Sequence, residues 1–225
     1  MKPLLLIFAS VAASSIPAFG QAAAHANERY KTQEGRTAVA QTLVAEGREK
    51  EQRPRELLTE IGVGTGMVIA DVGTGAGFML PYMSEMVGPK GKVYAEDIFP
   101  DFLAKAKKNA ADHKLANVEF IGGTDHDPKL PANTFDRILI MDAYHHFDYP
   151  KEMLAVVSKA LKANGTLAIV EYHKERFANQ KGGDPNHVRF DAAGLVKEIE
   201  GYGFTQVSQK DFIPKMQYIT LFKKK

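Results

Sequence analysis

The feature that most constrains the fold is a glycine-rich turn that follows a short apolar run. Residues 67–72 read Met-Val-Ile-Ala-Asp-Val, and the next five residues are Gly-Thr-Gly-Ala-Gly, ending at Gly77. A buried strand that passes directly into a helix favours glycine here, because the chain turns sharply and a ligand can approach backbone that carries no Cβ. Dinucleotide-binding folds use the longer spacing G-x-G-x-x-G to receive a pyrophosphate. The carboxylate of Asp71, two residues before the first glycine, favours a cationic ligand instead.

Strand and helix patterns alternate along the rest of the chain. Such alternation predicts right-handed crossovers and a parallel sheet covered by helices. The last two strands follow each other through Pro214 with no helix between them, so one antiparallel strand is expected. The longest irregular stretch, residues 174–189, is interpreted as a lid or acceptor loop. The predicted strands cover residues 67–72, 92–97, 117–121, 135–141, 165–171, 204–210 and 217–223, and the predicted helices 55–61, 78–87, 101–113, 149–161 and 191–201.

Composition excludes several classes of protein. A length of 225 residues suits one α/β domain with a sizeable core, and a charged fraction of 25% is typical of globular chains. The formal net charge of only +2 argues against a nucleic-acid partner, which needs a clustered basic face. The chain has no cysteine, so disulfides, thiolate metal sites and thiol nucleophiles are excluded. We expect no metal site.

The first residues have the pattern of an export signal. Lys2 precedes an apolar run over 4–13, which is too short to span a bilayer comfortably, since a spanning helix takes about 20 residues. Small residues at 18–20 and 22–26 offer two cleavage motifs. The protein is therefore predicted to be exported to the periplasm without stable membrane insertion after cleavage; an uncleaved membrane anchor is the alternative. The predicted organisation is a signal peptide over 1–26, a helical segment over 27–61 and the main domain over 62–225.

Acidic and polar residues follow the other predicted strands. Glu96 and Asp97 end the second strand, roughly 20 residues beyond the glycine turn, which is the spacing of an acid that binds ribose hydroxyls. Because strand side chains alternate between faces, only one of these carboxylates is expected to face the site. The loop after the third strand contains Asp125, whose side chain or neighbouring amides suit an adenine edge. After the fourth strand, Asp142, Tyr144 and two histidines are expected near a transferred group.

These pieces together resemble the class I S-adenosylmethionine-dependent methyltransferases, over roughly residues 52–225. The turn after the first strand matches the family's first motif, and Leu130-Pro131 to Phe135-Asp136 is similar to the segment that leads into its fourth strand. Gln52-Arg53-Pro54 and the segment 211–214 are similar to a poorly characterised bacterial subgroup with exported members. The resemblance implies a Rossmann-like, doubly wound, seven-stranded α/β sheet in the order 3-2-1-4-5-7-6, and S-adenosyl-L-methionine as the cofactor. The implied cofactor-binding residues are Asp71, Gly73, Thr74, Gly75, Gly77, Asp97, Ile98, Thr124, Asp125 and Asp142.

The implied activity is methyl transfer to a small-molecule acceptor, at oxygen or nitrogen. The stretch after the fourth strand lacks the prolines typical of enzymes that methylate amino groups of nucleic acids or glutamine. A hydroxyl acceptor needs a base near neutral pH, and His145 and His146 are the catalytic candidates, with His187 from the long loop behind them. The alternatives are a catalytically degenerate protein that binds the cofactor or another nucleoside, and an NAD-dependent oxidoreductase, which the glycine spacing disfavours. No oligomeric state is predicted.

Overall fold

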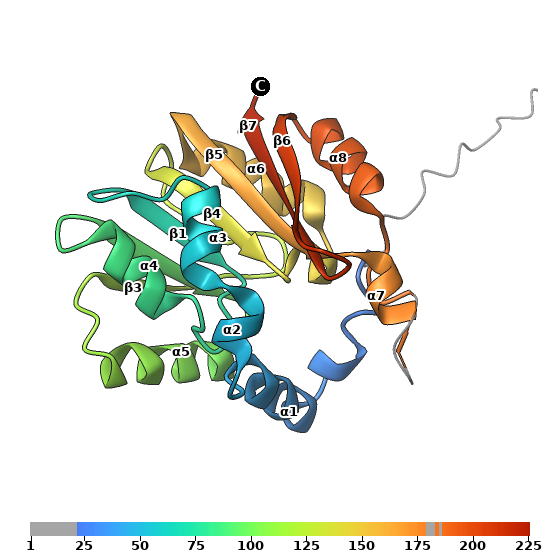
Figure 1. The fold of residues 1–225 in the computed structure, drawn as a ribbon, viewed down its shortest axis with the longest axis horizontal. Coiled ribbons are helices and arrows are strands. Elements are labelled where there is room, and N and C mark those ends of the chain that lie inside the picture. The colour runs from blue at the N-terminus through green and yellow to red at the C-terminus, as the bar shows by residue number, and fades with distance from the viewer. Residues whose placement is uncertain (1–21, 179–182, 185) are drawn as a thin grey trace, which may run out of the picture.

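The protein folds around one seven-stranded sheet (Figure 1). The computed structural model describes residues 22–178, 183–184 and 186–225. The sheet order is β3-β2-β1-β4-β5-β7-β6; the first five strands pair in parallel, and β7 runs antiparallel to both of its neighbours. The predicted Rossmann-like α/β fold and its strand order are confirmed. The strands are β1 (Val68–Val72), β2 (Lys92–Asp97), β3 (Val118–Gly122), β4 (Phe135–Met141), β5 (Leu161–Tyr172), β6 (Phe204–Ile213) and β7 (Gln217–Lys224).

Helices cover both faces of the central strands, and strand side chains alternate between these two faces. In β4, Ile138 and Ile140 join one apolar cluster, whereas Leu139 and Met141 join the other. The first cluster is closed by α6 and α8, and the second by α3, α4 and α5. These helices are α3 (Pro54–Glu60), α4 (Leu80–Val87), α5 (Pro100–Asp112), α6 (Pro150–Ala160) and α8 (Ala192–Gly201).

Proline sets where several helices begin. The first residues of α3, α5 and α6 are Pro54, Pro100 and Pro150. A proline in the first turn loses no helical hydrogen bond, because the N–H groups there have no partner within the helix. The element boundaries differ most from the predictions in two places. The strand β5 begins directly after α6, since Leu161 pairs with Phe135, and the stretch expected to be irregular begins with the short helix α7 (Lys174–Ala178).

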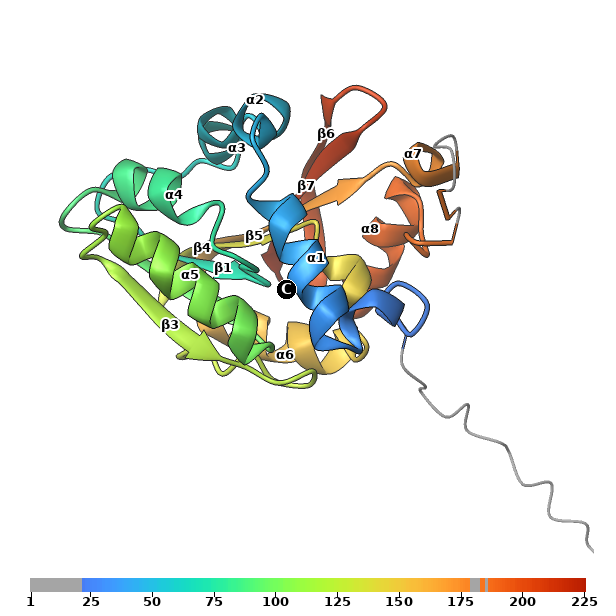
Figure 2. The same ribbon diagram turned by 90° about the horizontal axis from the view of Figure 1, so that it is seen from below.

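The N-terminal segment crosses the end of the sheet at which the parallel strands terminate (Figure 2). It contains η1 (Glu28–Tyr30), α1 (Gln33–Leu43) and α2 (Arg48–Gln52), which lead into α3. Val39 and Ala40 of α1 pack against Phe102 of α5. The Arg36 guanidinium forms an ion pair with Asp101 at 2.9 Å. The segment is therefore fixed to α5, over the carboxyl ends of the strands.

The last residues of the predicted signal peptide also contact the domain. The N–H groups of Ala22 and Ala23 donate to the carbonyl and the carboxylate of Asp148, at 3.0 and 3.2 Å. The side chains of Ala23 and Ala26 are buried. The remaining leader residues, 1–21, lie outside the described residues. Within the part of the chain that the structure describes, no helix combines the length and apolar character needed to cross a membrane.

Candidate functional site

The glycine turn after β1 adopts backbone angles that favour glycine. Gly73 has φ of 76° and Gly75 has φ of 57°, both in the left-handed region. A Cβ on Gly73 would lie 2.7 Å from the Cβ of Ala143, which follows β4. The N–H groups of Gly73 and Thr74 donate to the carbonyl of Glu96 at 3.0 and 2.8 Å. The turn is thus held between the ends of β2 and β4, where no larger residue fits at its first position.

Two carboxylates at the end of β2 meet this turn. Asp97 accepts hydrogen bonds from the N–H of Gly75 and the N–H of Phe99, each at 2.9 Å. Glu96 accepts a longer one from the N–H of Gly73, at 3.4 Å. Both carboxylates line the same cavity, so the expectation that only one of them faces the site was wrong. The cavity lies beyond the end of the strand, where side chains from either face of the sheet reach it.

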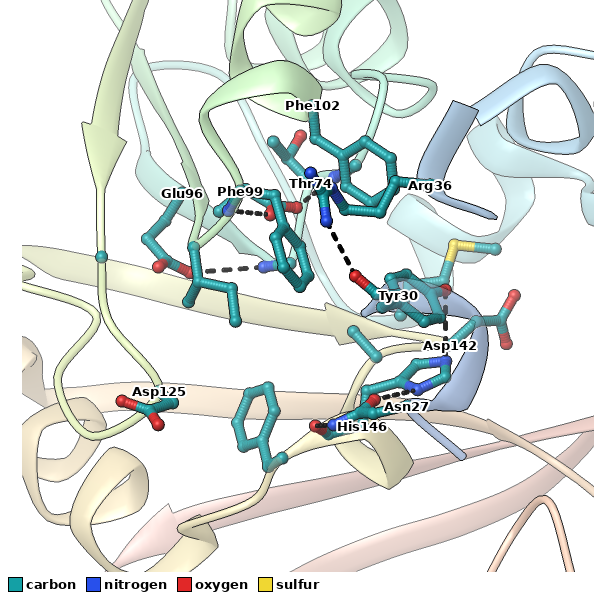
Figure 3. Close-up of a pocket in the computed structure, with 18 of the residues that line it drawn as sticks. Asn27, Tyr30, Arg36, Thr74, Glu96, Phe99, Phe102, Asp125, Asp142 and His146 are labelled. Carbon is teal, nitrogen blue, oxygen red and sulfur yellow. Dashed lines mark hydrogen bonds between the residues drawn. The ribbon is translucent and has the colours of Figure 1, made fainter. Parts of the chain in front are cut away.

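This cavity has a volume of about 590 Å³, within the usual range for sites that bind small molecules (Figure 3). Its walls come from the carboxyl ends of β1, β2 and β4, from the loop after β3 and from the N-terminal segment. Ten of the residues predicted to form the site line it: Asp71, Gly73, Thr74, Gly75, Asp97, Ile98, Thr124, Asp125, Asp142 and His146.

Two predicted site residues lie elsewhere. Gly77 does not line the cavity; a Cβ there would lie 3.0 Å from the Cα of Ala106, so this glycine allows α5 to pack closely against the turn. His145 also does not line the cavity, because its side chain is 1% exposed and its Nδ1 contacts both carboxylate oxygens of Glu171, at 2.8 and 2.9 Å. The sequence alone did not distinguish the buried histidine from His146, its neighbour at the cavity wall.

The end of the cavity near β1 and β2 is acidic and poorly solvated. Burial raises the pKa of Asp71 to about 6, against the hydrogen bond from Thr74, and raises that of Asp97 to about 6. Burial, reinforced by the charge of Asp97, raises the pKa of Glu96 well above its usual range. Among the described residues, no lysine or arginine forms an ion pair with these three carboxylates. A ligand that brings positive charge and hydroxyl donors would stabilise their ionised forms.

The other end of the cavity is built around His146. Figure 3 shows Asp125 standing apart from Tyr30, Asp142 and His146. The Asn27 amide nitrogen donates to the His146 carbonyl at 3.0 Å, so its oxygen accepts from His146 Nδ1 at 2.9 Å. The other ring nitrogen, Nε2, then accepts from the Tyr30 hydroxyl at 3.3 Å. These partners assign His146 the tautomer with its proton on Nδ1.

Burial controls the ionisation of this end. It lowers the pKa of His146 well below its usual range, an effect strengthened by the neighbouring histidines, so the ring is neutral at pH 7. It raises the pKa of Asp142 to about 6, with Glu171 adding to the effect and Arg48 opposing it. Gln217 donates to both oxygens of Asp142, at 2.7 and 2.9 Å, and a nitrogen of Arg48 lies 3.8 Å away.

Sequence reasoning missed the contribution of the N-terminal segment to the site. Tyr30 and Arg48 line the cavity, yet they lie in a polar stretch without a recognisable motif. The available signal is the helical spacing of Val39 and Leu43, which indicates an amphipathic helix but not its position over the strand ends. Phe99 and Phe102 complete the aromatic wall at this place.

Comparison with known proteins gives a family match and several relatives. A family model described as a methyltransferase domain matches residues 64–211. A ubiquinone/menaquinone biosynthesis C-methyltransferase, UbiE, from Hahella chejuensis is 27% identical over 121 residues, which are 53% of this chain and 49% of that protein. The corresponding protein from Pseudomonas fluorescens is 28% identical over 114 residues, covering 50% and 44%. The chain thus spans about half the length of the curated relatives it matches.

Solved structures extend the likeness over most of the chain. A SAM-dependent methyltransferase from Aquifex aeolicus has a TM-score of 0.76 and 31% identity, and the match covers 82% of this chain and 96% of that one. The PH0226 protein from Pyrococcus horikoshii has a TM-score of 0.67 at 19% identity, covering 81% and 93%, and supports the fold alone.

Proposed function

Since this chain belongs to the methyltransferase-domain family and is a class I S-adenosylmethionine-dependent methyltransferase, we propose that it methylates a small molecule held beside Tyr30 and His146. The observation that carries this proposal is the continuity of the cavity. One cavity extends from the carboxylates at the ends of β1 and β2 to the region enclosed by the N-terminal segment. It therefore offers an acceptor region next to the region that suits the cofactor.

The residues at the acidic end fit S-adenosyl-L-methionine. The cofactor carries a sulfonium and an ammonium group, and the carboxylates here lack a cationic partner among the described residues. A Cβ on Gly75 would lie 2.8 Å from Leu43, so this glycine lets the N-terminal segment approach the turn closely. When bound, the cofactor supplies a methyl group activated by the positive charge on sulfur.

We assign the residues of this end to the parts of the cofactor that the family resemblance implies, and the contacts in the structure support these roles. Asp97 would accept from the ribose hydroxyls, because two backbone N–H groups already orient its carboxylate. Asp71 and Thr74, joined by a 2.7 Å hydrogen bond, would hold the methionine part together with the glycine backbone. Ile98 and the loop residues Thr124 and Asp125 would surround the adenine.

The walls of the acceptor region favour a compact, largely apolar or aromatic acceptor. Tyr30, Leu43, Phe147 and Met153 contribute apolar surface there. Burial raises the pKa of Tyr30 to about 12, so its hydroxyl keeps its proton and donates to a neighbour. The enclosed shape and the chain's net charge of +2 favour a small molecule over a nucleic acid.

His146 is the group that we propose as the proton acceptor. Its ring is neutral, and its Nε2 carries the lone pair that the Tyr30 hydroxyl contacts. An acceptor hydroxyl or amine that replaced this contact would pass its proton to Nε2, while Asn27 holds Nδ1 and thereby the orientation of the ring. His145 has a supporting position behind it, bound to Glu171.

The test separates cofactor binding from methyl transfer. Calorimetry should detect binding of S-adenosylmethionine and S-adenosylhomocysteine, and labelled cofactor with envelope extract and a panel of phenols and amines should yield a methylated product. Product analysis distinguishes oxygen or nitrogen methylation from the carbon methylation named for the curated relatives. Binding without transfer to any acceptor would favour a degenerate binding protein, and absence of binding would overturn the proposal.

A variant pair tests the proton acceptor. We expect His146→Ala to lower kcat by 10²- to 10⁴-fold, the usual contribution of a general base, with cofactor affinity retained. His113→Ala, on the exposed end of α5, is the control and should behave as the wild type. Equal turnover in both variants would exclude His146 as the base.

We also propose that the protein is exported. The support is the charge and apolar pattern of residues 2–13. Cleavage before Ala22 would leave the contacts of Ala22 and Ala23 with Asp148 intact. Of the two predicted cleavage motifs, the one at residues 18–20 is therefore favoured.

A further inference from the structure

Three histidines from two distant parts of the chain lie together behind the acceptor region, and of the three only His146 lines the cavity. One ring nitrogen from each of His145, His146 and His187 lies within 4.8 Å of the others. The ring of His145 is centred 4.1 Å from that of His146 and 4.9 Å from that of His187. His145 and His146 follow β4, whereas His187 belongs to the loop before α8. No motif in the sequence links them.

The hydrogen bonds of two of these rings leave Nε2 as the nitrogen with the lone pair. His145 Nδ1 faces the Glu171 carboxylate at 2.8 Å, while its Nε2 is buried and has no hydrogen-bond partner. His146 Nδ1 donates to Asn27, which leaves Nε2 to accept from Tyr30. A carboxylate or amide oxygen behind Nδ1 is the arrangement that orients histidines as metal ligands.

We propose that His145, His146 and His187 bind a divalent transition-metal ion of the Zn²⁺ type, with a fourth position for water or a small ligand. Three imidazoles and an open position form a common zinc site, with Zn–N bonds of about 2.0–2.1 Å. Such bonds bring ligand nitrogens to about 3.4 Å from each other. The rings must therefore close by an ångström or so from their spacing of up to 4.8 Å, and Tyr30 must release His146.

The donor set accounts for the choice of metal. The chain has no cysteine, so a soft thiolate site is impossible, but imidazole suits zinc, copper and nickel. The Glu171 carboxylate, fully buried against His145, holds Nδ1 of that ring and so directs Nε2 toward the ion. The expectation of no metal site came from the absence of cysteine, which excludes thiolate ligands but not histidine ligands.

The test of this site does not depend on the proposed methyl transfer, since it measures metal binding without cofactor. An ion bound to His146 Nε2 uses the lone pair that we assign to proton acceptance, so the two roles exclude each other. Added Zn²⁺ is therefore expected to inhibit turnover in the wild type. Failure of metal binding would leave the methyltransferase proposal untouched.

The experiment uses the protein without an affinity tag, titrated with Zn²⁺ in a calorimeter and with Co²⁺ in a spectrophotometer. We expect one equivalent of Zn²⁺ to bind, and Co²⁺ to give the intense visible bands of a four-coordinate ion. His187→Gln removes a ligand outside the cavity lining and should weaken binding by more than 100-fold. Glu171→Gln should weaken it by about 10- to 100-fold, the usual effect of an outer-shell change.

The control is His113→Gln, which removes an exposed histidine from the end of α5. It should bind Zn²⁺ as the wild type does. Circular dichroism and thermal unfolding of the metal-free variants check that each is folded. The proposal is overturned if the wild type binds no Zn²⁺, or if folded His187→Gln binds it as tightly as His113→Gln does.

Discussion

The backbone N–H of Gly75 donates to the carboxylate of Asp97 over 2.9 Å, which joins the turn after β1 to the end of β2. The second oxygen of the same carboxylate accepts from Phe99 at the start of α5. One side chain therefore orders three backbone segments around the cavity before any ligand enters. Because the carboxylate is already oriented, a ligand that binds it pays little further entropy for that contact.

Removal of this carboxylate should abolish tight cofactor binding. We expect Asp97→Ala to weaken the affinity for S-adenosylhomocysteine by on the order of 100-fold or more, since hydrogen bonds to a charged group contribute about 1.5–3 kcal/mol each. Calorimetry measures the change. Asp112→Ala, at the exposed end of α5, is the matched control. Unchanged affinity of a folded Asp97→Ala variant would remove Asp97 from the cofactor site.

Replacement of Gly73 by alanine should destabilise the protein more than replacement of Gly66, whose backbone conformation is similar. Gly73 and Gly66 have φ of 76° and 81°, but only at Gly73 would a Cβ meet another atom, 2.7 Å away on Ala143. Gly66→Ala should cost about 1–2 kcal/mol from the left-handed backbone alone. Gly73→Ala should cost more, and should also lower cofactor affinity.

Urea unfolding of both variants measures the difference. If Gly73→Ala and Gly66→Ala lost the same stability and bound the cofactor equally, the close approach of the two loops would have no energetic role.

Asp71 should make the stability of the ligand-free protein depend on pH. Its pKa rises from 3.8 to about 6 on folding, mainly through burial. The folded state therefore binds more protons than the unfolded state between about pH 4 and 6, and the stabilisation from protonated Asp71 is lost as pH rises through that window. Relative to the wild type, Asp71→Asn should gain stability on going from pH 4 to pH 7, by up to about 3 kcal/mol.

Denaturant unfolding of wild type and Asp71→Asn at several pH values checks this sign. The exposed Asp112→Asn should have no such trend. In the wild type, cofactor affinity should rise as pH increases through 6, because the ionised carboxylate is the form that attracts a cationic ligand. A pH-independent difference between wild type and Asp71→Asn would contradict the assignment.

Arg36 should keep the N-terminal segment over the cavity. Its Nε donates to both oxygens of Asp101, at 2.9 and 3.1 Å, and a terminal nitrogen donates to the Tyr30 carbonyl at 2.9 Å. We expect Arg36→Ala to increase hydrogen exchange across residues 28–43 and to raise KM for the acceptor. Arg55→Ala, which breaks exposed ion pairs, is the control and should leave exchange in this segment unchanged. Equal protection from hydrogen exchange across residues 28–43 in both variants would mean that apolar packing alone holds this segment in place.

The mature N-terminus should precede the alanines that contact Asp148. Mass spectrometry of protein recovered from the periplasm should find Gln21 as the first residue, following cleavage after the small-x-small motif at residues 18–20. A mature chain starting at Asn27 would lose the buried Ala23 and Ala26, and that result would contradict the assigned boundary. Retention of the full leader in the membrane fraction would instead support the uncleaved anchor.

The sequence by itself determined the alternation of strands and helices, the glycine turn and the acid at the end of β2, whereas the strand order came from the family resemblance. The first three follow from local rules: apolar periodicity sets strands and helices, and left-handed backbone together with close approach selects glycine. Parallel strands bring the loops at their carboxyl ends to one edge of the sheet. Ten of the predicted residues lie in these loops or strand ends and therefore line the cavity.

Tertiary structure alone decided which residues close that edge. In the folded chain, His145 is buried against Glu171, whereas His146 lies at the cavity wall. Gly77 packs against Ala106, and Tyr30 lies over the cavity. Each outcome depends on contacts between segments far apart in the sequence, whose relative positions no local period encodes. The physical reason is that burial and hydrogen bonding are settled by the packing of whole elements, whereas sequence patterns specify only each element's own face.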